Sequence, residues 1–296
     1  MKIRAAVVKE VGQPFEIETL DLAPPREKEV LVRIRAAGIC HSDWNIRTGE
    51  TEHPLPAALG HEGAGIVESL GEGVTSLRPG EHVALSWAPG CGSCYYCSGR
   101  RPALCETWKE ALWAGTLLDG TTRLSLDGRP VYHYCALACF AEYAVVPEAC
   151  CVPVDKEVPL EVAALIGCAV TTGLGASMNT VKVEEGASVV IYGMGGVGLS
   201  ILAGARLAGA APIICVDLWE EKLELARSFG ATDAFKADDQ PHEKILAATA
   251  QRGADYVFEA TGSAEVQEAA FDSVRPGGKL ILVGLSATGT KTNFPG

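Results

Sequence analysis

The sequence predicts an α/β protein with two domains, a barrel-like all-β domain followed by a domain built on a parallel sheet. One observation is a change of pattern near residue 170, where short β-rich runs give way to apolar strands that alternate with amphipathic helices. The other is length, because 296 residues are long for one core and sufficient for two. We therefore expect domains at residues 1–169 and 170–296.

The first domain is expected to be all-β because its apolar runs are short and are separated by turns. Gly and Pro mark these turns, as at Gly71-Glu72-Gly73 and Arg78-Pro79-Gly80. Many short strands with non-local pairing favour a barrel. The expected strands are Ala5–Val8, Glu29–Ala36, Gly63–Ser69, His82–Ser86 and Ala141–Val146. Two Asp-Gly pairs make Leu117–Tyr134 an expected hairpin.

The second domain alternates between strands and helices, which is typical of a parallel sheet with crossover helices. The expected strands are Ser188–Tyr192, Ile213–Asp217, Tyr256–Glu259 and Lys279–Val283. The expected helices begin at Gly196, Glu220 and Ala264.

Composition excludes several classes of function. No apolar run approaches the roughly 20 residues that span a membrane, and the start of the chain lacks the apolar core of a signal peptide. A net charge of −12 disfavours nucleic acids and anionic membranes as partners. These features predict a cytoplasmic protein whose thiols are reduced, with no membrane or nucleic-acid partner.

Four cysteines, Cys91, Cys94, Cys97 and Cys105, have the spacing of a metal site. Zn²⁺ with four thiolates forms a closed tetrahedral site that orders a loop and leaves no position for chemistry. A disulfide cluster is the non-metal alternative, although reduced thiols are expected in this chain. A [4Fe–4S] cluster is the other metal alternative, because thiolates suit both metals.

A glycine-rich turn predicts a dinucleotide site. The segment Gly193-Met194-Gly195-Gly196-Val197-Gly198 follows an expected strand and opens a helix, so its backbone can approach a pyrophosphate. Asp217 ends the next strand, where a carboxylate would accept hydrogen bonds from the ribose hydroxyls and repel a 2′-phosphate. NAD is therefore favoured over NADP. The alternative role for Asp217 is an N-cap of the helix that begins at Glu220.

Three separate segments contain residues that could bind a second metal ion. Cys40-His41-Ser42-Asp43 follows a strand, Gly60-His61-Glu62-Gly63 precedes one, and Gly167-Cys168-Ala169 lies at the domain junction. Two cysteines and one histidine would leave a fourth position open on Zn²⁺. Spacing alone does not establish this site, because a lone buried cysteine usually acts as a small apolar residue.

Taken together, the motifs resemble those of the zinc-dependent alcohol dehydrogenases of the medium-chain dehydrogenase/reductase family. The resemblance covers C-H-S-D, G-H-E, the four cysteines, G-C-x-V-T-T-G, G-x-G-G-V-G and V-D. The long loop before Tyr134 is similar to that of the animal-type alcohol dehydrogenases and the glutathione-dependent formaldehyde dehydrogenases. The resemblance implies a GroES-like barrel domain joined to a Rossmann domain.

The resemblance also implies roles for individual residues, including two zinc ions per chain. The catalytic zinc ligands would be Cys40, His61 and Cys168, and the structural zinc ligands Cys91, Cys94, Cys97 and Cys105. Ser42 would take the substrate proton, Asp43 would orient His61, and Glu62 would lie beside the metal. The cofactor-binding residues would be His41, Thr172, Gly193, Gly195, Gly196, Val197, Gly198, Asp217 and Lys222. The substrate pocket would include Trp87, Tyr134 and Cys135.

The expected reaction is hydride transfer between a primary alcohol or aldehyde and NAD. The alternatives are a formaldehyde dehydrogenase acting on S-hydroxymethylglutathione and a non-catalytic zinc-stabilised relative. A glutathione substrate calls for cations near the cleft, and Lys109 stands where the resemblance expects an Arg.

The chain departs from the family at two places. Asn45 occupies a position where many members carry a proton-relaying His, so the proton must leave through water, His41 or the cofactor ribose. Members also continue several tens of residues past Gly296, with segments that form homodimers or homotetramers and return to the barrel domain. We therefore expect an exposed sheet edge near Lys279–Val283.

Overall fold

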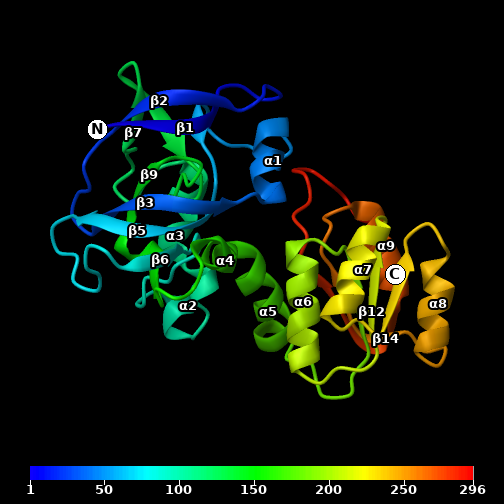
Figure 1. The fold of residues 1–296 in the computed structure, drawn as a ribbon. Coiled ribbons are helices and arrows are strands. Elements are labelled where there is room, and N and C mark those ends of the chain that lie inside the picture. The colour runs from blue at the N-terminus through cyan, green and yellow to red at the C-terminus, as the bar shows by residue number, and fades with distance from the viewer. Residues whose placement is uncertain (296) are drawn as a thin grey trace. The chain divides into compact units, whose positions relative to one another are not determined.

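The computed structural model describes residues 1–295. Its contacts divide the chain into unit 1, Met1–Cys168, and unit 2, Ala169–Gly296 (Figure 1). Unit 1 contains a closed barrel and a separate antiparallel sheet, whereas unit 2 contains one parallel sheet. The expected architecture, a unit with a β-barrel followed by a unit built on a parallel sheet, is confirmed.

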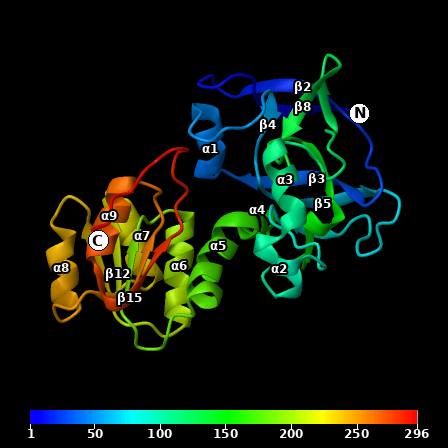
Figure 2. The same cartoon turned by 180° about the vertical axis from the view of Figure 1, so that it is seen from behind.

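The barrel of unit 1 has five short strands that close in the order β1-β2-β7-β8-β4. They are β1 (Lys2–Val8), β2 (Glu16–Leu22), β7 (Leu124–Leu126), β8 (Arg129–His133) and β4 (Ala57–Ala58). Along β1, Ile3, Ala5 and Val7 are buried while Lys2 and Arg4 are exposed, the period of two that a strand with one buried face requires. The hairpin of β7 and β8 turns at Asp127-Gly128 and stands beside β2 at the top of both views (Figures 1 and 2).

The second sheet of unit 1 is antiparallel throughout, in the order β10-β6-β5-β3-β9. Its strands are β3 (Glu29–Gly38), β5 (Glu62–Leu70), β6 (His82–Leu85), β9 (Tyr143–Pro147) and β10 (Cys151–Val154). The short helical segments of this unit are α1 (His41–Thr48), α2 (Tyr95–Ser98), α3 (Glu106–Ala114) and α4 (Leu160–Leu165), with 3₁₀ turns at Pro102–Leu104 and Glu148–Cys150. Helix α4 packs on β3, β5 and β6.

A buried ion network ties the hairpin to the second sheet. The Arg123 side chain is fully buried, contacts Glu29, and lies 2.7 Å from the Asp119 carboxylate. The backbone N–H of Arg123 also donates to Nε2 of His133, at 3.0 Å. Because His133 directly precedes Tyr134, this network fixes the end of β8 from which the Tyr134 ring projects.

Unit 2 is a five-stranded parallel sheet in the order β13-β12-β11-β14-β15. The strands are β11 (Val189–Tyr192), β12 (Ile213–Asp217), β13 (Asp233–Lys236), β14 (Ala254–Glu259) and β15 (Val274–Leu282). The helices are α5 (Thr171–Gly175), α6 (Gly196–Leu207), α7 (Glu220–Phe229), α8 (Pro241–Ala248) and α9 (Ala264–Asp272), with a π-helical turn at Ala176–Thr180. A second π-helical turn, Ile166–Val170, spans the boundary between the two units. All residues of β11 are buried, as a central parallel strand demands.

Small residues allow the helices of unit 2 to pack closely. A Cβ added at Gly204 on α6 would lie 2.0 Å from the Ser177 Oγ, and one added at Gly173 on α5 would lie 2.4 Å from Ser200. Side chains at these glycines would therefore push α6 away from the α5 segment.

Several boundaries differ from the sequence prediction. Strand β2 was not predicted, because its acidic residues lack an apolar pattern, and β15 begins five residues before the predicted Lys279. In the sheet of the described residues β15 is an edge strand, and Leu282 is 47% exposed. The exposed edge expected near Lys279–Val283 is therefore present.

One helical stretch, Leu160–Thr180, is long and apolar enough to cross a membrane by those two criteria. Polar residues such as Thr171 and Asn179 interrupt this stretch, so it does not form an uninterrupted apolar run in the sequence. Its first part, α4, packs on three strands of unit 1, and its later part packs on α6 of unit 2. The core helix of a soluble protein can pass the same test, and 39% of the apolar window in this stretch is buried within the structure.

Candidate functional site: two cysteine clusters and a glycine-rich turn

The first cysteine cluster lies in the loop that contains α2. The sulfur atoms of Cys91, Cys94, Cys97 and Cys105 all lie within 4.8 Å of one another. The Cys91–Cys97 and Cys94–Cys105 sulfur pairs are 4.0 and 3.8 Å apart. A disulfide needs about 2.05 Å, so these distances exclude the disulfide alternative. A tetrahedral ion with Zn–S bonds of about 2.3 Å separates its sulfurs by about 3.8 Å, so the cluster fits one zinc ion.

The backbone and nearby side chains of this loop favour a thiolate at Cys91, whereas desolvation raises the pKa of Cys97 to about 11. The N–H of Cys94 donates to the Cys91 Sγ and the N–H of Cys91 donates to the Cys105 Sγ, each at 3.4 Å. A hydrogen bond from the Thr107 side chain, followed by backbone donors, lowers the pKa of Cys91. A deprotonated sulfur is the form that binds a metal ion.

The second cluster joins residues that are far apart in the sequence. Ligand atoms of Cys40, His61, Glu62 and Cys168 lie within 4.8 Å of one another. Cys40 precedes α1, His61 directly precedes β5, Glu62 is its first residue, and Cys168 lies in the π-helical turn Ile166–Val170. The structure thus brings together the three predicted catalytic ligands and the predicted neighbouring carboxylate, and this donor set fits a zinc ion.

Two glycines make room for this convergence. A Cβ added at Gly38 would lie 2.1 Å from the Glu62 Oε2, so a larger residue would displace that carboxylate. A Cβ added at Gly167 would lie 2.2 Å from the Leu85 carbonyl oxygen, so Cys168 reaches the cluster only because its neighbour is glycine.

Asp43 fixes the buried imidazole of His61. Its Oδ1 lies 3.3 Å from the Nδ1 of His61 and accepts the backbone N–H of Gly60 at 2.9 Å. Its Oδ2 accepts the N–H of Cys40 at 3.3 Å. Burial opposes protonation of His61, but hydrogen bonds with Asp43 and Cys40 outweigh it and raise the pKa to about 10. With Nδ1 directed at Asp43, Nε2 is the nitrogen available to a metal.

Aromatic rings surround this second cluster. The Tyr134 and Trp87 rings are edge-on to His61, with centroids 5.1 and 6.5 Å away. Cys135 is buried beside Tyr134, and the Ser42 Oγ lies 3.6 Å from the Cys40 Sγ. The predicted pocket residues therefore lie in unit 1 close to the metal ligands, whereas His41 and Lys109 are exposed on α1 and α3.

One residue near the cluster was not found by sequence reasoning. The His53 ring packs edge-on against Tyr134 at 5.4 Å, and both of its nitrogens are buried without a hydrogen-bond partner among residues 1–295. Burial lowers the pKa of His53 to about 4. Its loop, Glu50–Pro54, carries no motif, so only the fold reveals this residue.

The glycine-rich turn of unit 2 has the geometry that a pyrophosphate needs. Gly193 has φ +91°, and a Cβ added at Gly198 would lie 1.8 Å from the Gly193 carbonyl oxygen. A Cβ added at Gly195 would meet nothing within 4 Å, so this position is open at the N-terminus of α6, which begins at Gly196. An open turn at a helix N-terminus is suited to an anion.

Asp217 lies beside this turn and is 8% exposed. Its Oδ2 accepts the N–H of Met194 at 2.7 Å, its Oδ1 accepts the N–H of Trp219 at 3.0 Å, and Lys222 lies 3.8 Å away. The residue that caps α7 is Trp219, so the alternative that Asp217 is the N-cap is wrong. Thr172 lies on α5, which packs against α6.

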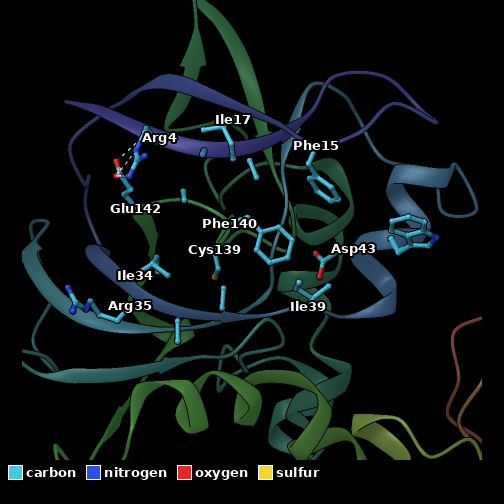
Figure 3. Close-up of a pocket in the computed structure, with 16 residues that line it drawn as sticks. Arg4, Phe15, Ile17, Ile34, Arg35, Ile39, Asp43, Cys139, Phe140 and Glu142 are labelled. Carbon is cyan, nitrogen blue, oxygen red and sulfur yellow. Dashed lines mark hydrogen bonds and ion pairs between the residues drawn. The ribbon is translucent and has the colours of Figure 1, made fainter. Parts of the chain in front are cut away.

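A separate, largely apolar pocket of about 700 Å³ lies between β1 and the end of β3. The Arg4–Glu142 ion pair lies at one end, while Phe15, Phe140 and Asp43 lie toward the other (Figure 3). Asp43 therefore lines this pocket and also contacts His61 of the second cluster.

Comparison with known proteins adds two family matches. Residues 26–156 match the alcohol dehydrogenase GroES-like domain, and residues 196–296 match the zinc-binding dehydrogenase domain. An S-(hydroxymethyl)glutathione dehydrogenase from Escherichia coli is 42% identical over 293 residues, which are 98% of this chain and 79% of the relative.

Solved structures agree with these matches. The benzyl alcohol dehydrogenase of Acinetobacter calcoaceticus is 38% identical with a TM-score of 0.93, over 100% of this chain and 80% of that one. A zinc-binding dehydrogenase from Sinorhizobium meliloti, bound to NADP, is 26% identical with a TM-score of 0.80, over 100% of this chain and 80% of that one.

Proposed function

Because the chain belongs to the zinc-dependent alcohol dehydrogenases of the medium-chain dehydrogenase/reductase family, we propose that it oxidises a hydroxymethyl group with NAD. The observation that carries the proposal is the meeting of Cys40, His61 and Cys168 beside the Glu62 carboxylate. With the two thiolates and the imidazole as its ligands, a zinc ion would keep a fourth position for substrate. A protein without catalysis gains little from such a site, which argues against the non-catalytic alternative. The first candidate substrate is S-(hydroxymethyl)glutathione, which the Escherichia coli relative is named for.

Residues of this chain provide the acid–base and orienting steps. Zinc, when bound to the second cluster, supplies a Lewis acid that lowers the pKa of an alcohol oxygen. Ser42, next to the cluster, takes the proton at its Oγ, and Asp43 holds His61 in one tautomer. Asn45 is buried and cannot act as an acid or base at neutral pH, so the proton passes onward to water, to exposed His41 or to the cofactor ribose.

A primary benzylic alcohol is the second candidate substrate. The Tyr134 and Trp87 rings beside His61 offer the aromatic edges and faces that stack against a substrate ring. The likeness to a benzyl alcohol dehydrogenase supports this candidate. For the glutathione carboxylates, the cation that the sequence offers is Lys109, which is exposed on α3 and stands where an Arg is expected.

The substrate test is a comparison of NAD reduction rates with S-(hydroxymethyl)glutathione, benzyl alcohol and a short aliphatic alcohol. The highest kcat/KM with the glutathione adduct would support the first candidate, and the highest with benzyl alcohol the second. No NAD reduction with any of them by zinc-loaded protein would contradict the proposed function.

Asp217 is proposed to select NAD over NADP. Its carboxylate would repel a 2′-phosphate, although Lys222 at 3.8 Å weakens that repulsion. We expect tighter binding of NAD in titrations of the wild type with both dinucleotides. Asp217→Gly should narrow the difference, mainly by weakening NAD binding, and equal affinities in the wild type would contradict the assignment.

A further inference from the structure

Glu259 is a fully buried carboxylate at the carboxyl end of β14, the edge of a parallel sheet where ligands bind. Its Oε1 accepts the backbone N–H of Thr261 at 2.5 Å, the Thr261 hydroxyl at 2.5 Å and the N–H of Gly262 at 2.9 Å. Its Oε2 is buried with no hydrogen-bond partner among residues 1–295. A buried oxygen without a partner costs free energy, so packing alone does not explain a carboxylate at this position.

The residues that Glu259 holds are in contact with the dinucleotide turn. Glu259 pairs in register with Tyr192 of β11, and Gly193 directly follows Tyr192. A Cβ added at Gly193 would lie 2.7 Å from the Thr261 Cγ2, so the Thr261 methyl group lies against the Cα of Gly193. The Glu259 carboxylate therefore holds Thr261 by hydrogen bonds, and Thr261 contacts Gly193, the first glycine of the turn.

The opposite side of the same turn is held by β12. The N–H of Gly193 donates to the Val216 carbonyl oxygen at 2.8 Å, and the N–H of Met194 donates to Asp217 at 2.7 Å. The turn is thus held between two carboxylates, Asp217 on one side and Glu259, acting through Thr261, on the other. Asp217 is the residue expected from the motif, whereas Glu259 belongs to no motif that the sequence presents.

We propose that Glu259 is a positioning residue for the dinucleotide, which fixes the Gly193 turn by ordering Thr261 and Gly262. The proposal rests on dinucleotide binding by the turn Gly193–Gly198. It requires no contact between Glu259 and the ligand, because a backbone that is already fixed loses less entropy when it binds.

The chain supplies a matched control on the same strand. Asp255, near the amino end of β14, accepts the N–H and the hydroxyl of Ser188, at 2.8 and 2.6 Å, and Arg275 at 2.6 Å. It has a comparable number of hydrogen bonds in the same sheet, but it lies at the edge away from the turn. Loss of either charge should destabilise unit 2, whereas only loss of the Glu259 charge should weaken dinucleotide binding.

The experiment measures dissociation constants for NAD and ADP-ribose by calorimetry in the zinc-loaded wild type, Glu259→Gln and Asp255→Asn, together with zinc content and thermal midpoints. We expect Glu259→Gln to bind both ligands about tenfold more weakly, because the charge-assisted hydrogen bonds that order Thr261 and Gly262 are about twice as strong as neutral ones. In Asp255→Asn we expect the dissociation constants to change by less than about twofold. Zinc content should stay unchanged in both.

Thr261→Ser keeps the hydroxyl bond to Glu259 and removes only the methyl group at Gly193, so it tests the link even if Glu259→Gln folds poorly. We expect it to weaken binding of both ligands about threefold. Unchanged dissociation constants in Thr261→Ser, or equal effects of Glu259→Gln and Asp255→Asn, would overturn the proposal. A wild type that binds neither ligand would overturn the proposed function, and this inference with it.

Discussion

The two cysteine clusters of unit 1 are built in opposite ways. The cluster Cys91–Cys105 is local in sequence, lies in a loop, and leaves three of its four cysteines partly exposed. The second cluster draws Cys40, His61 and Cys168 from three distant segments, and His61 is only 2% exposed. A local cluster can bind metal while the loop forms, so metal binding adds directly to folding free energy. The distant ligands meet only after unit 1 has folded, so that site depends on the fold.

The largest expected effect separates activity from folding at the second cluster. Cys40→Ser should lose one zinc ion and abolish NAD reduction, because one of the three proposed protein ligands is removed. Unit 1 should stay folded, since its strands do not need this metal to pair. Elemental analysis, circular dichroism and the rate assay check this. A variant that keeps two zinc ions would contradict the ligand assignment.

The complementary change should affect folding more than chemistry. Cys91→Ser is expected to lose the other zinc ion and to lower the free energy of unfolding by several kcal/mol, because structural zinc binding is coupled to folding. Denaturant unfolding with parallel zinc analysis is the measurement, and Cys215→Ser, a buried cysteine outside both clusters, is a control for loss of a thiol. Iron bound in this cluster, or an unchanged free energy of unfolding without zinc, would contradict the assignment of a structural zinc site.

A smaller effect is expected where a neighbouring residue orients a ligand. Asp43→Asn keeps the size of the side chain but loses the charge that faces His61 at 3.3 Å. Mutation of a residue that hydrogen-bonds to a metal ligand typically lowers metal affinity or activity by about 10- to 100-fold. The metal affinity of the second cluster should fall by that factor, while the four-cysteine cluster keeps its zinc. Competition with a chelator measures both, and equal loss from both clusters would show a general destabilisation instead.

A further expected effect concerns the fold rather than the clusters, because acid should protonate a buried histidine of unit 1. Burial, and then the charge of Arg123, lowers the pKa of His133 to about 4, below its ordinary 6.5. The unfolded chain therefore binds more protons between pH 6.5 and 4. The stability that neutral His133 contributes is complete above pH 6.5 and is lost on acidification, by at most about 1.4 kcal/mol per pH unit.

His133→Asn should make the unfolding free energy less dependent on pH in this window, because Asn does not titrate and its amide oxygen can accept the N–H of Arg123. The test is denaturant unfolding of both proteins at several pH values between about 7.5 and 4, a range that includes both pKa values of His133. An unchanged slope would mean that other groups, such as His53, dominate the acid response.

The same contrast decides how much could be predicted from the sequence. The spacing of Cys91, Cys94 and Cys97 indicates a metal site without any fold, because the ligands are local. Cys40, His61 and Cys168 could be grouped only through resemblance to a family, since nothing in their spacing brings them together. The parallel sheet was predicted from strand–helix alternation, whereas β2 was missed because its acidic residues lack an apolar pattern. His53 and Glu259 have surroundings that only tertiary contacts create.

The position of β15 has a consequence for how backbone amides exchange with solvent deuterium. Strand β11 lies at the centre of the sheet, between β12 and β14, and all of its side chains are buried. Strand β15 pairs with β14 on one side and, within residues 1–295, has no strand on the other. Amides that face outward from β15 are open to water, while those of β11 exchange only when the sheet opens. We therefore expect amide protection across unit 2 to decline from Val190 toward Leu282, although both lie in strands of one sheet.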